Sequence, residues 1–535
     1  MIDLDPPTNI GEPIPRGEVH GVSVTLPTWA ANVAYELGED WVASKMKSGY
    51  PRFCVHWIIK QLQESVCDKY GRETEECMAF NVYEAAARAK QFVGLRCTPE
   101  ESKQLRIVRL STPFSEDKTV TATIAFLFYP KSLQPVAKQY WQHTGEGVSS
   151  RMAEYFLQRD RGVANLEQVF VEERFGRNLD LSLATEAKWA VRKRLANQIS
   201  EHSIVVQPEH VYLYATGMTS IFSAHNLFMA VKNSNGNNLK TVCFGFPYTD
   251  TLKILEKWGP GCIFYPSGSE QELDELETFL TAGNKISGLF CEFPSNPLLN
   301  SPNIMRIRQM ADKFDFLVAV DDTVGNILNI DVMPYVDLTM GSLTKIFSGD
   351  CNVMGGNIIL NPRGKHFQAL KPTLDEQFQD AFWAEDAIYL ERNSRDFIAR
   401  NRRTNANAQA VVDLLSKSAI VKQVYYPSLS PTRANFEAVK VPDGGYGGLL
   451  SVVFKEPSMA EIFFDTLHIA KGPSLGTNFT IACPYTIIAH FHELDFVESC
   501  GVPRALVRVS IGLEATEDLI ARFTTALKTA SKNAH

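Results

Sequence analysis

Residues 286–321 read ISGLFCEFPSNPLLNSPNIMRIRQMADKFDFLVAVD. Two apolar runs, residues 286–292 and 317–321, have the length of buried strands, and residues 304–314 between them have the apolar periodicity of a helix. A strand, a helix and a second strand in this order form the crossover unit that joins parallel strands. This stretch therefore predicts an α/β fold with a mostly parallel sheet.

The same alternation continues on both sides of this stretch. From about residue 187 we expect helices over residues 189–199, 219–232, 251–257 and 270–281, and strands over residues 211–214, 241–246 and 262–265. Ligands bind at the carboxyl ends of the strands in such sheets. Residues that directly follow strands are therefore the candidates for chemistry.

The two ends of the chain differ from this middle part. The first 150 residues begin with a proline-rich leader and contain helical patterns at residues 57–69 and 81–92 and a strand-like run at residues 119–129. After residue 416, a strand is expected at residues 448–454 and helices at residues 458–467 and 517–531. We expect an added α+β region of unknown role over residues 1–150, a large domain over residues 151–415 and a smaller α/β domain over residues 416–535.

Composition and charge argue against several kinds of partner. The 535 residues are 45% hydrophobic and carry a formal net charge of −8, whereas nucleic acids and anionic membranes attract an excess of lysine and arginine. No run is long and apolar enough to span a bilayer, and the start MIDLDPPTNI lacks the basic flank of a signal peptide, so we expect a cytoplasmic protein. The ten cysteines form no CxxC pair, and His490 and His492 have no third ligand nearby, so we expect no metal site.

Lys345 is the first candidate for covalent chemistry. It lies in GSLTKIFSGDCNVMGG, residues 341–356, just after the apolar run 336–340, and Ser342 and Thr344 beside it can donate hydrogen bonds to a phosphate. A lysine that forms a Schiff base needs a firmly held backbone of this kind. The competing interpretation is a solvated loop lysine, which is far more common in proteins.

Two other strand ends support a cofactor site. Asp321 ends the strand at residues 317–321, where a buried carboxylate requires a cation such as a protonated pyridine nitrogen, unless it merely caps a turn. Gly217 in ATGMTSIF precedes a predicted helix, whose free N–H groups can bind a phosphate. An ordinary turn between a strand and a helix is the alternative there.

Three further residues could contact a cofactor or substrate. Tyr248 follows the strand at residues 241–246 and could stack on a flat ring, although packing explains it equally well. Asn296 in CEFPSNPLLN could bind a ring hydroxyl or a carboxylate, or could simply build an Asn-Pro turn. Arg508 in LVRVSIGLE could bind a carboxylate through two hydrogen bonds, or could be a surface arginine on an edge strand.

Together these segments resemble the PLP-dependent Cys/Met-metabolism enzymes from about residue 170 to the end of the chain. Six motifs occur in the order of that family, and an S-L-G segment at Ser474 also matches: TGM, the stacking tyrosine, E-x-P-x-N-P, V-D-x-T, S-x-T-K and R-x-S-x-G-x-E. The resemblance implies pyridoxal 5′-phosphate (PLP) as cofactor and the fold type I architecture of PLP-dependent transferases. In that architecture a mostly parallel seven-stranded sheet carries helices on both faces.

The resemblance also implies roles for individual residues. Lys345, Tyr248 and Asp321 would form the catalytic group: Lys345 carries PLP as a Schiff base and moves protons, Asp321 pairs with the pyridinium nitrogen and Tyr248 stacks on the ring. The remaining roles would be phosphate binding by Gly217, Met218, Ser342 and Thr344, a contact of Asn296 with the ring hydroxyl or the substrate carboxylate, and binding of that carboxylate by Ser474 and Arg508.

The chain departs from the family pattern in two places. The family completes its phosphate site with a Tyr-x-Arg pair from a neighbouring subunit, and in ERFGRNLDLS, residues 173–182, Phe175 replaces the tyrosine while Arg177 is retained. A homodimer or homotetramer with Arg177 reaching across the interface is therefore expected. In VDDTV, Asp322 and Val324 replace the usual asparagine and aromatic residue, which predicts a different pocket wall.

The stretches FVEERFGRNLDLS and HGVSVTLPTW, with the long N-terminal region, resemble the fungal cystathionine γ-synthases of the family. This subgroup implies a γ-replacement that joins an O-acyl-L-homoserine, expected to be the O-acetyl ester, to L-cysteine and gives L-cystathionine. O-acetylhomoserine sulfhydrylation and cystathionine cleavage remain alternatives on the same scaffold. A catalytically inactive regulatory subunit is the alternative outside enzymes, and the presence of Lys345, Asp321 and Arg508 argues against it.

Overall fold

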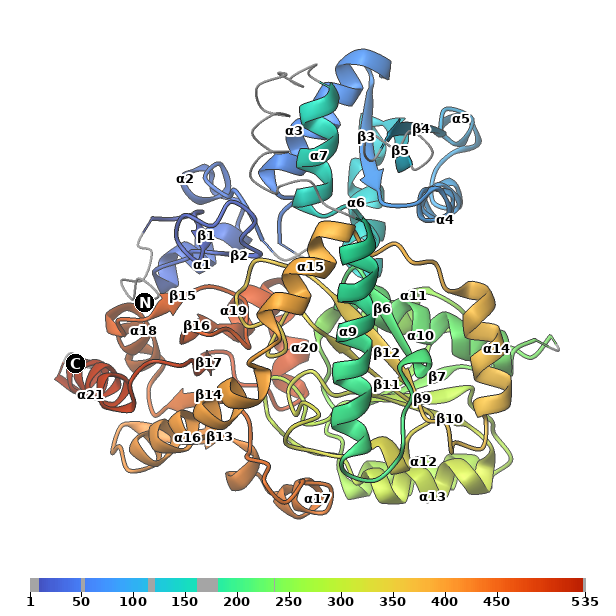
Figure 1. Ribbon diagram of the computed structural model, residues 1–535. Coiled ribbons are helices and arrows are strands. Elements are labelled where there is room, and N and C mark those ends of the chain that lie inside the picture. The colour runs from blue at the N-terminus through green and yellow to red at the C-terminus, as the bar shows by residue number, and fades with distance from the viewer. Residues whose placement is uncertain (1–8, 50–52, 114–120, 161–180, 235, 533–535) are drawn as a thin grey trace.

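The computed structural model describes residues 9–49, 53–113, 121–160, 181–234 and 236–532 (Figure 1). In these ranges the strands form sheets of seven, five and three strands and a two-stranded ladder. In the view of Figure 1, the large sheet lies on the right, the five-stranded sheet lies on the left, and the three-stranded sheet of the N-terminal part lies at the top.

The large sheet is mostly parallel, as predicted. Its strand order is β6-β12-β11-β10-β9-β7-β8, and β12 alone of the seven runs antiparallel to its neighbours. The strands are β6 (Val211–Tyr214), β7 (Thr241–Phe244), β8 (Cys262–Tyr265), β9 (Gly288–Glu292), β10 (Leu317–Asp321), β11 (Leu338–Ser342) and β12 (Gly356–Leu360). The carboxyl ends of six strands therefore meet at one edge.

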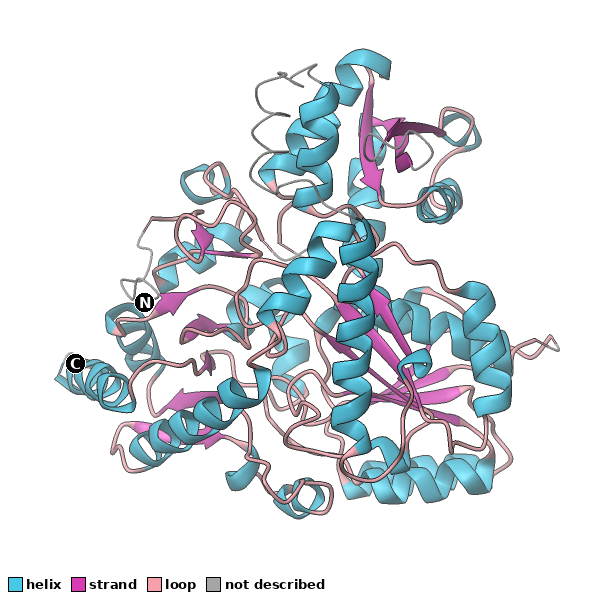
Figure 2. Ribbon diagram, in the orientation of Figure 1, coloured by secondary structure: helices cyan, strands magenta, loops and turns pink. Residues whose placement is uncertain are grey.

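Helices cover both faces of this sheet, which confirms the fold class (Figure 2). Alternate residues of each strand enter opposite cores: in β10, Val318 and Val320 pack with one set of helices, and Leu317 and Ala319 pack with the other. The first set is α9 (Leu181–Ser200), α12 (Glu270–Thr281), α13 (Ile304–Phe314) and α15 (Ala384–Asn393). The second set is α10 (Gly217–Lys232), α11 (Thr249–Lys257) and α14 (Phe367–Gln377).

The C-terminal part of the chain forms a second α/β layer. Its sheet has the order β13-β14-β17-β16-β15, with strands β13 (Val421–Tyr425), β14 (Leu449–Phe454), β15 (Ala470–Lys471), β16 (Ile481–Pro484) and β17 (Val507–Ser510). Its helices are α16 (Phe397–Ser416), α17 (Arg433–Glu437), α18 (Pro457–Thr466), α19 (Tyr485–His490), α20 (Leu494–Ser499) and α21 (Thr516–Lys532). Helices α16, α18 and α21 share one apolar core with this sheet.

The N-terminal part forms a separate α+β layer around an antiparallel sheet of order β3-β5-β4. Its strands are β3 (Glu75–Phe80), β4 (Arg106–Pro113) and β5 (Thr121–Pro130), and its helices are α3 (Trp57–Tyr70), α4 (Tyr83–Gly94), α5 (Pro99–Ser102), α6 (Gln134–Thr144) and α7 (Ser150–Asp160). The strand predicted at residues 119–129 is thus β5, and the predicted helices are α3 and α4.

The leader before residue 57 packs elsewhere. It contains β1 (Pro13–Ile14), β2 (Ser23–Val24), α1 (Trp29–Glu36) and α2 (Asp40–Ala43). Leu26 and Ala31 share an apolar core with Tyr485 and Ile488 of the C-terminal layer, and Leu26 N donates a hydrogen bond of 3.0 Å to Lys471 O. The apolar side chains of the leader thus pack on the C-terminal layer, at the opposite end of the sequence. The domain boundaries proposed at residues 150 and 415 stay predictions.

Most predicted elements differ from the structure by one to three residues at their ends, as expected where helix and strand termini fray. Several elements were not predicted, among them β3, β4, α7, β12, α14, α15, α16 and β13. Within the described ranges, no helix combines the length and apolarity needed to cross a bilayer.

Candidate active site

The residues selected from the sequence meet at the carboxyl edge of the large sheet. Adjacent strands place Asp321 in register with Glu292 on one side and Met340 on the other. A cavity opens there and extends to the C-terminal layer. Nine of the predicted residues line it: Gly217, Met218, Tyr248, Asn296, Asp321, Ser342, Lys345, Ser474 and Arg508.

Lys345 lies three residues beyond the end of β11, and its amine faces this cavity. Its Nζ donates a hydrogen bond of 3.1 Å to Ser474 Oγ, which comes from the C-terminal layer. Burial, which leaves the charged ammonium poorly solvated, together with the nearby Arg508 charge lowers the pKa of Lys345 to about 8. Lys345 is therefore partly buried in the cavity wall, and the interpretation as a solvated loop lysine is wrong.

Two buried carboxyl groups lie beside each other at the strand ends. Asp321 Oδ1 accepts a hydrogen bond of 2.9 Å from Thr323 N, and burial raises the pKa of Asp321. Glu292 accepts the backbone N–H groups of Tyr248 and Asn296, while burial and the Asp321 carboxylate raise the pKa of Glu292 to about 8. These carboxyl groups would be stabilised by a cationic ligand in the cavity.

The start of α10 and the end of β11 form an anion cradle. A Cβ atom on Gly217 would lie 2.6 Å from Ser342 Cβ, so only glycine lets the helix start approach the strand this closely. Ser342 Oγ is buried, and within the described part of the chain it has no hydrogen-bond partner. Helix N-termini and unpaired hydroxyl groups of this kind bind phosphate.

Thr344 differs from the expectation. Its Oγ1 accepts a hydrogen bond of 3.0 Å from Gly355 N and contacts Gly355 O at 3.3 Å, and Thr344 is not part of the cavity wall. The hydroxyl is used to hold the turn between β11 and β12, and this geometry does not support phosphate binding by Thr344. Arg177 lies outside the described residues.

Arg508 lies in the central strand β17 of the C-terminal sheet and is buried, so it is not a surface arginine. Its Nη1 donates to Asn296 Oδ1 at 3.2 Å, and its Nη2 donates to the carbonyl oxygens of Pro473 and Ser474 at 2.6 and 3.1 Å. These hydrogen bonds all go to neutral oxygen atoms, and among the described residues Arg508 forms no ion pair, although its charge partly opposes the burial that raises the pKa of the nearby Glu292. A buried guanidinium without an anionic partner is well suited to an anionic ligand.

Sequence reasoning missed several residues of the cavity wall. Glu292 ends a buried strand just as Asp321 does, so the same argument could have identified it. Val22, Ser23 and Phe53 of the leader also line the cavity, together with Tyr485, the first residue of α19. Val22 and Ser23 belong to the stretch HGVSVTLPTW, which resembles the fungal members of the family. No local pattern places the leader residues at the cavity, because they reach it only through the packing of the leader on the C-terminal layer.

Metal ligands are not grouped in the part of the chain that the structure describes. His490 is buried and contacts Thr249 Oγ1 at 3.1 Å and Glu493 Oε1 at 2.8 Å, as a packing histidine would. All ten cysteines are unbonded thiols.

Comparison with protein families identifies the chain. The family model described as Cys/Met metabolism PLP-dependent enzyme matches residues 191–528, which is more than half of the chain. The chain belongs to this family. A second model, described as the N-terminal domain of fungal trans-sulfuration enzymes, matches residues 58–149, the α+β layer around β3-β5-β4.

Relatives in the Cys/Met metabolism family align along nearly the whole chain. The cystathionine γ-synthase of Neurospora crassa is 41% identical over 98% of this chain and 99% of its own length. That of Saccharomyces cerevisiae is 37% identical over 97% of this chain and 99% of its own length. A solved structure of cystathionine γ-synthase from Xanthomonas oryzae pv. oryzae, in complex with aminoacrylate and cysteine, is 25% identical, with a TM-score of 0.52 over 60% of this chain and 82% of that one.

The residues around the cavity fit the PLP cofactor of this family. The set offers an amine for the aldehyde (Lys345), a carboxyl group for the pyridine nitrogen (Asp321), and an unpaired hydroxyl and a helix start for the phosphate (Ser342 and Gly217). Each of these groups is buried or partly buried, so the cofactor would supply the partners that they need.

Proposed function

We propose that this enzyme catalyses a PLP-dependent γ-replacement that joins an O-acyl-L-homoserine to L-cysteine and forms L-cystathionine. The observation that carries the proposal is that Lys345 and Arg508 both contact Ser474. The Ser474 hydroxyl accepts a hydrogen bond from the Lys345 amine, and the Ser474 carbonyl oxygen accepts one from the Arg508 guanidinium. A reactive amine and an anchor for a carboxylate thus lie at one point, as an amino-acid substrate requires.

Arg508 and Asn296 would bind the α-carboxylate of the substrate. The fork geometry of a guanidinium matches a carboxylate, and Asn296 is already hydrogen bonded to Arg508. Among the described residues, Arg508 forms no ion pair with a carboxylate. The substrate carboxylate would neutralise this buried charge, and the cost of removing the guanidinium from water is already met in the folded protein. Arg508 therefore orients the amino acid relative to Lys345.

Lys345 would remove the α-proton and pass protons between the α- and β-carbons. When bound, PLP withdraws electrons from the amino acid and makes its α-proton acidic. A lysine with a pKa of about 8 is partly neutral near pH 7, so it can accept that proton and later return it. Asp321 would keep the pyridine nitrogen protonated, and Tyr248 would stack on the ring.

In the net reaction the bond between Cγ and the ester oxygen breaks and a bond between Cγ and the cysteine sulfur forms. The acyl group leaves as a carboxylate, and the thiol proton balances its charge. Lys345 and Arg508 are the only cations of the cavity wall, which is made of described residues, and both have other roles. An acyl group without its own charge, such as acetyl, therefore suits this wall better than a succinyl group.

The phosphate would be bound by Gly217, Met218 and Ser342 of the same chain. As in the family pattern, Arg177 of a second copy of the chain would complete this site in a homodimer or homotetramer. A cytoplasmic location stays a prediction.

The test is a steady-state assay of the purified enzyme with O-acetylhomoserine and either cysteine or sulfide, with products identified by mass spectrometry. Cystathionine formation with cysteine, at a kcat/KM well above that of homocysteine formation with sulfide, is expected. A preference for sulfide, or consumption of added cystathionine as the faster reaction, would replace the proposal by sulfhydrylation or cleavage. The K345A variant is the control for catalysis that does not depend on the site.

A further inference from the structure

The segment that follows Lys345, residues 345–352, is called here the lysine loop, and it is clamped at two places. At its start, Arg400 of α16 donates to Ile346 O at 3.0 Å and to Phe347 O at 2.8 Å. Both contacts come from a helix that packs on the C-terminal layer. This clamp holds the backbone directly after the reactive lysine.

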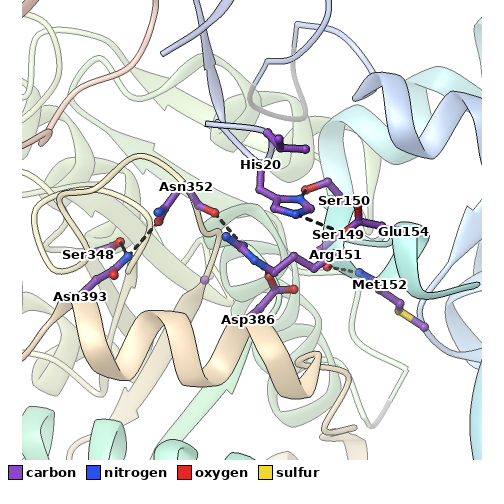
Figure 3. A network of polar contacts seen from close by, with 12 residues as sticks. His20, Ser149, Ser150, Arg151, Met152, Glu154, Ser348, Asn352, Asp386 and Asn393 are labelled. Atoms are coloured by element: carbon purple, nitrogen blue, oxygen red, sulfur yellow. Dashed lines mark hydrogen bonds and ion pairs between the residues drawn. The ribbon is translucent and has the colours of Figure 1, made fainter. Parts of the chain in front are cut away.

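The second clamp comes from the N-terminal region. Arg151 of α7 donates through Nη1 to Asn352 O at 2.7 Å, and the same nitrogen lies 3.1 Å from Asp386 Oδ1 of α15 (Figure 3). Arg151 is only 2% exposed, and its guanidinium lies over the ring of Tyr389, 3.9 Å from the ring centroid. One buried cation therefore joins α7, α15 and the end of the lysine loop.

The leader contacts the same end of the loop. Val22 N donates to Cys351 O at 2.8 Å, and Asn352 Nδ2 donates to Glu18 Oε2 at 3.2 Å. Figure 3 shows the side chain of Asn393 on the other side of Asn352, and Asn393 Nδ2 donates to Asn352 Oδ1 at 2.9 Å and to Ser348 Oγ at 3.1 Å. Residues 351–352 thus depend on the N-terminal part of the chain for several of their contacts.

The physical chemistry of Arg151 argues for a positional role beyond packing. Its Nε and Nη2 have no hydrogen-bond partner in the described part of the chain. The free-energy cost of removing the guanidinium from water is therefore only partly offset by its contacts. Apolar residues of similar volume fill such a space with equal or greater stability. What they cannot supply is a directional donor to the Asn352 carbonyl.

A shift at Asn352 would reach Lys345 through a short path. Gly349 N donates to Lys345 O at 2.8 Å, and Asn478 N, close to Ser474 in the sequence, donates to Gly349 O at 2.8 Å. Residues 345–349 therefore form a hydrogen-bonded turn. Asn393 links Ser348 of this turn to Asn352, so a displacement at residue 352 reaches the residues beside Lys345.

We propose that Arg151 is a positioning residue by which the N-terminal region holds the lysine loop and keeps the Lys345 amine aimed into the cavity. This inference rests on the proposed role of Lys345. The inference assigns a function to the N-terminal region, which is to hold the lysine loop in place. Arg151 does this through its hydrogen bond to the carbonyl oxygen of Asn352.

The test compares four full-length variants, loaded with PLP. R151M removes the guanidinium and leaves the buried Asp386 carboxylate without its cationic partner, which can prevent folding. R151M/D386N removes both charges and keeps the helices apolar or neutral at the contact. R151K retains the charge but cannot serve the carbonyl and the carboxylate in the same planar geometry. The matched control is R88M, because Arg88 pairs with Glu146 within the N-terminal region at 3.2 Å and does not touch the lysine loop.

Two measurements separate positioning from general stability. Hydrogen–deuterium exchange of peptides that cover residues 343–356 reports the order of the loop without substrate. We expect exchange there at least about tenfold faster in R151M/D386N, with residues 288–292 and 317–321 unchanged, and an intermediate rate in R151K. In the same variants kcat should fall about tenfold to a hundredfold with KM within about twofold, since a small misplacement of a catalytic group has effects of this size.

The proposal is overturned if the loop exchanges at the wild-type rate in R151M/D386N, or if R88M produces the same exchange and the same fall in kcat. A uniform rise in exchange over the whole chain would show a merely structural role and would also overturn it. Loop exchange is measured without substrate, so the two proposals can fail separately. Faster exchange in the variants would support the role of Arg151 even if the assay identified a different reaction. Cystathionine formation would support the γ-replacement even if the exchange of the loop were unchanged.

Discussion

Arg508 and Asn296 are 212 residues apart in the sequence, yet Arg508 Nη1 donates a hydrogen bond of 3.2 Å to Asn296 Oδ1. Arg508 belongs to the C-terminal sheet, whereas Asn296 follows strand β9 of the large sheet. The contact therefore joins the two residues proposed to bind the substrate carboxylate across the junction of two layers. Substrate binding should depend on how these layers pack.

Replacing Arg508 by lysine should raise KM for the amino-acid substrate about tenfold to a hundredfold, because a charge-assisted hydrogen bond contributes about 1.5–3 kcal/mol. Lysine keeps the charge but loses the fork geometry that matches a carboxylate. The apparent Kd for PLP should change far less. Steady-state kinetics and PLP titration by absorbance would measure both constants, and an equal loss of substrate and cofactor would indicate a structural role.

Replacing Lys345 by alanine should lower kcat by at least about a thousandfold, since a positioned acid–base group contributes up to about four orders of magnitude. The absorbance band of the lysine-bound cofactor should also disappear. The visible spectrum and the cystathionine assay would be recorded on the same preparation. An active variant with the wild-type spectrum would show that another lysine carries the cofactor.

Replacing Phe53 by alanine should lower kcat/KM for the acyl donor about tenfold while PLP stays bound, because an aromatic ring of the cavity wall is lost. The leader residue Leu37 is exposed and is the matched control, so L37A should behave as wild type. Kinetics with O-acetylhomoserine at saturating cysteine would give the comparison. Unchanged kinetics in F53A would remove the leader from the substrate site.

Asp322 predicts a pH dependence of stability. Burial, and then the Asp321 charge, raise the pKa of Asp322 well above its usual range, so the folded protein keeps this proton after the unfolded chain has lost it. Stability from this group is complete below the unfolded pKa near 4 and is lost as pH rises, by up to about 1.4 kcal/mol per pH unit. D322N removes this loss, so its stability relative to wild type should increase between pH 5 and pH 8.

Urea unfolding at pH 5 and pH 8, with saturating PLP for both proteins, would measure this difference. An asparagine is the neutral isostere of a protonated aspartic acid, so kcat of D322N should stay within about threefold of wild type. A constant difference in stability at the two pH values would mean that Asp322 is ionised in the folded protein.

The order of elements in the middle of the chain was accessible from the sequence because each buried strand is a short apolar run and each helix has its own period. This local information also located Asp321, Gly217 and Lys345, since each follows a strand. Strand β12 was missed because the segment after Lys345 contains glycines and turn residues that hide a short strand, and its antiparallel direction is set by pairing with β11 and β6.

The sequence by itself determined the chemistry that is available: an amine, a carboxyl group, a helix start and a guanidinium at the ends of strands, in an order shared with one enzyme family. Only the tertiary structure decided which of these groups meet, that Thr344 turns away to Gly355, and that Val22, Phe53 and Arg151 belong to the surroundings of Lys345. The reason is physical: strand and helix periods are local, whereas burial, pKa shifts and contacts between the leader and the lysine loop arise only when distant segments exclude water from one another.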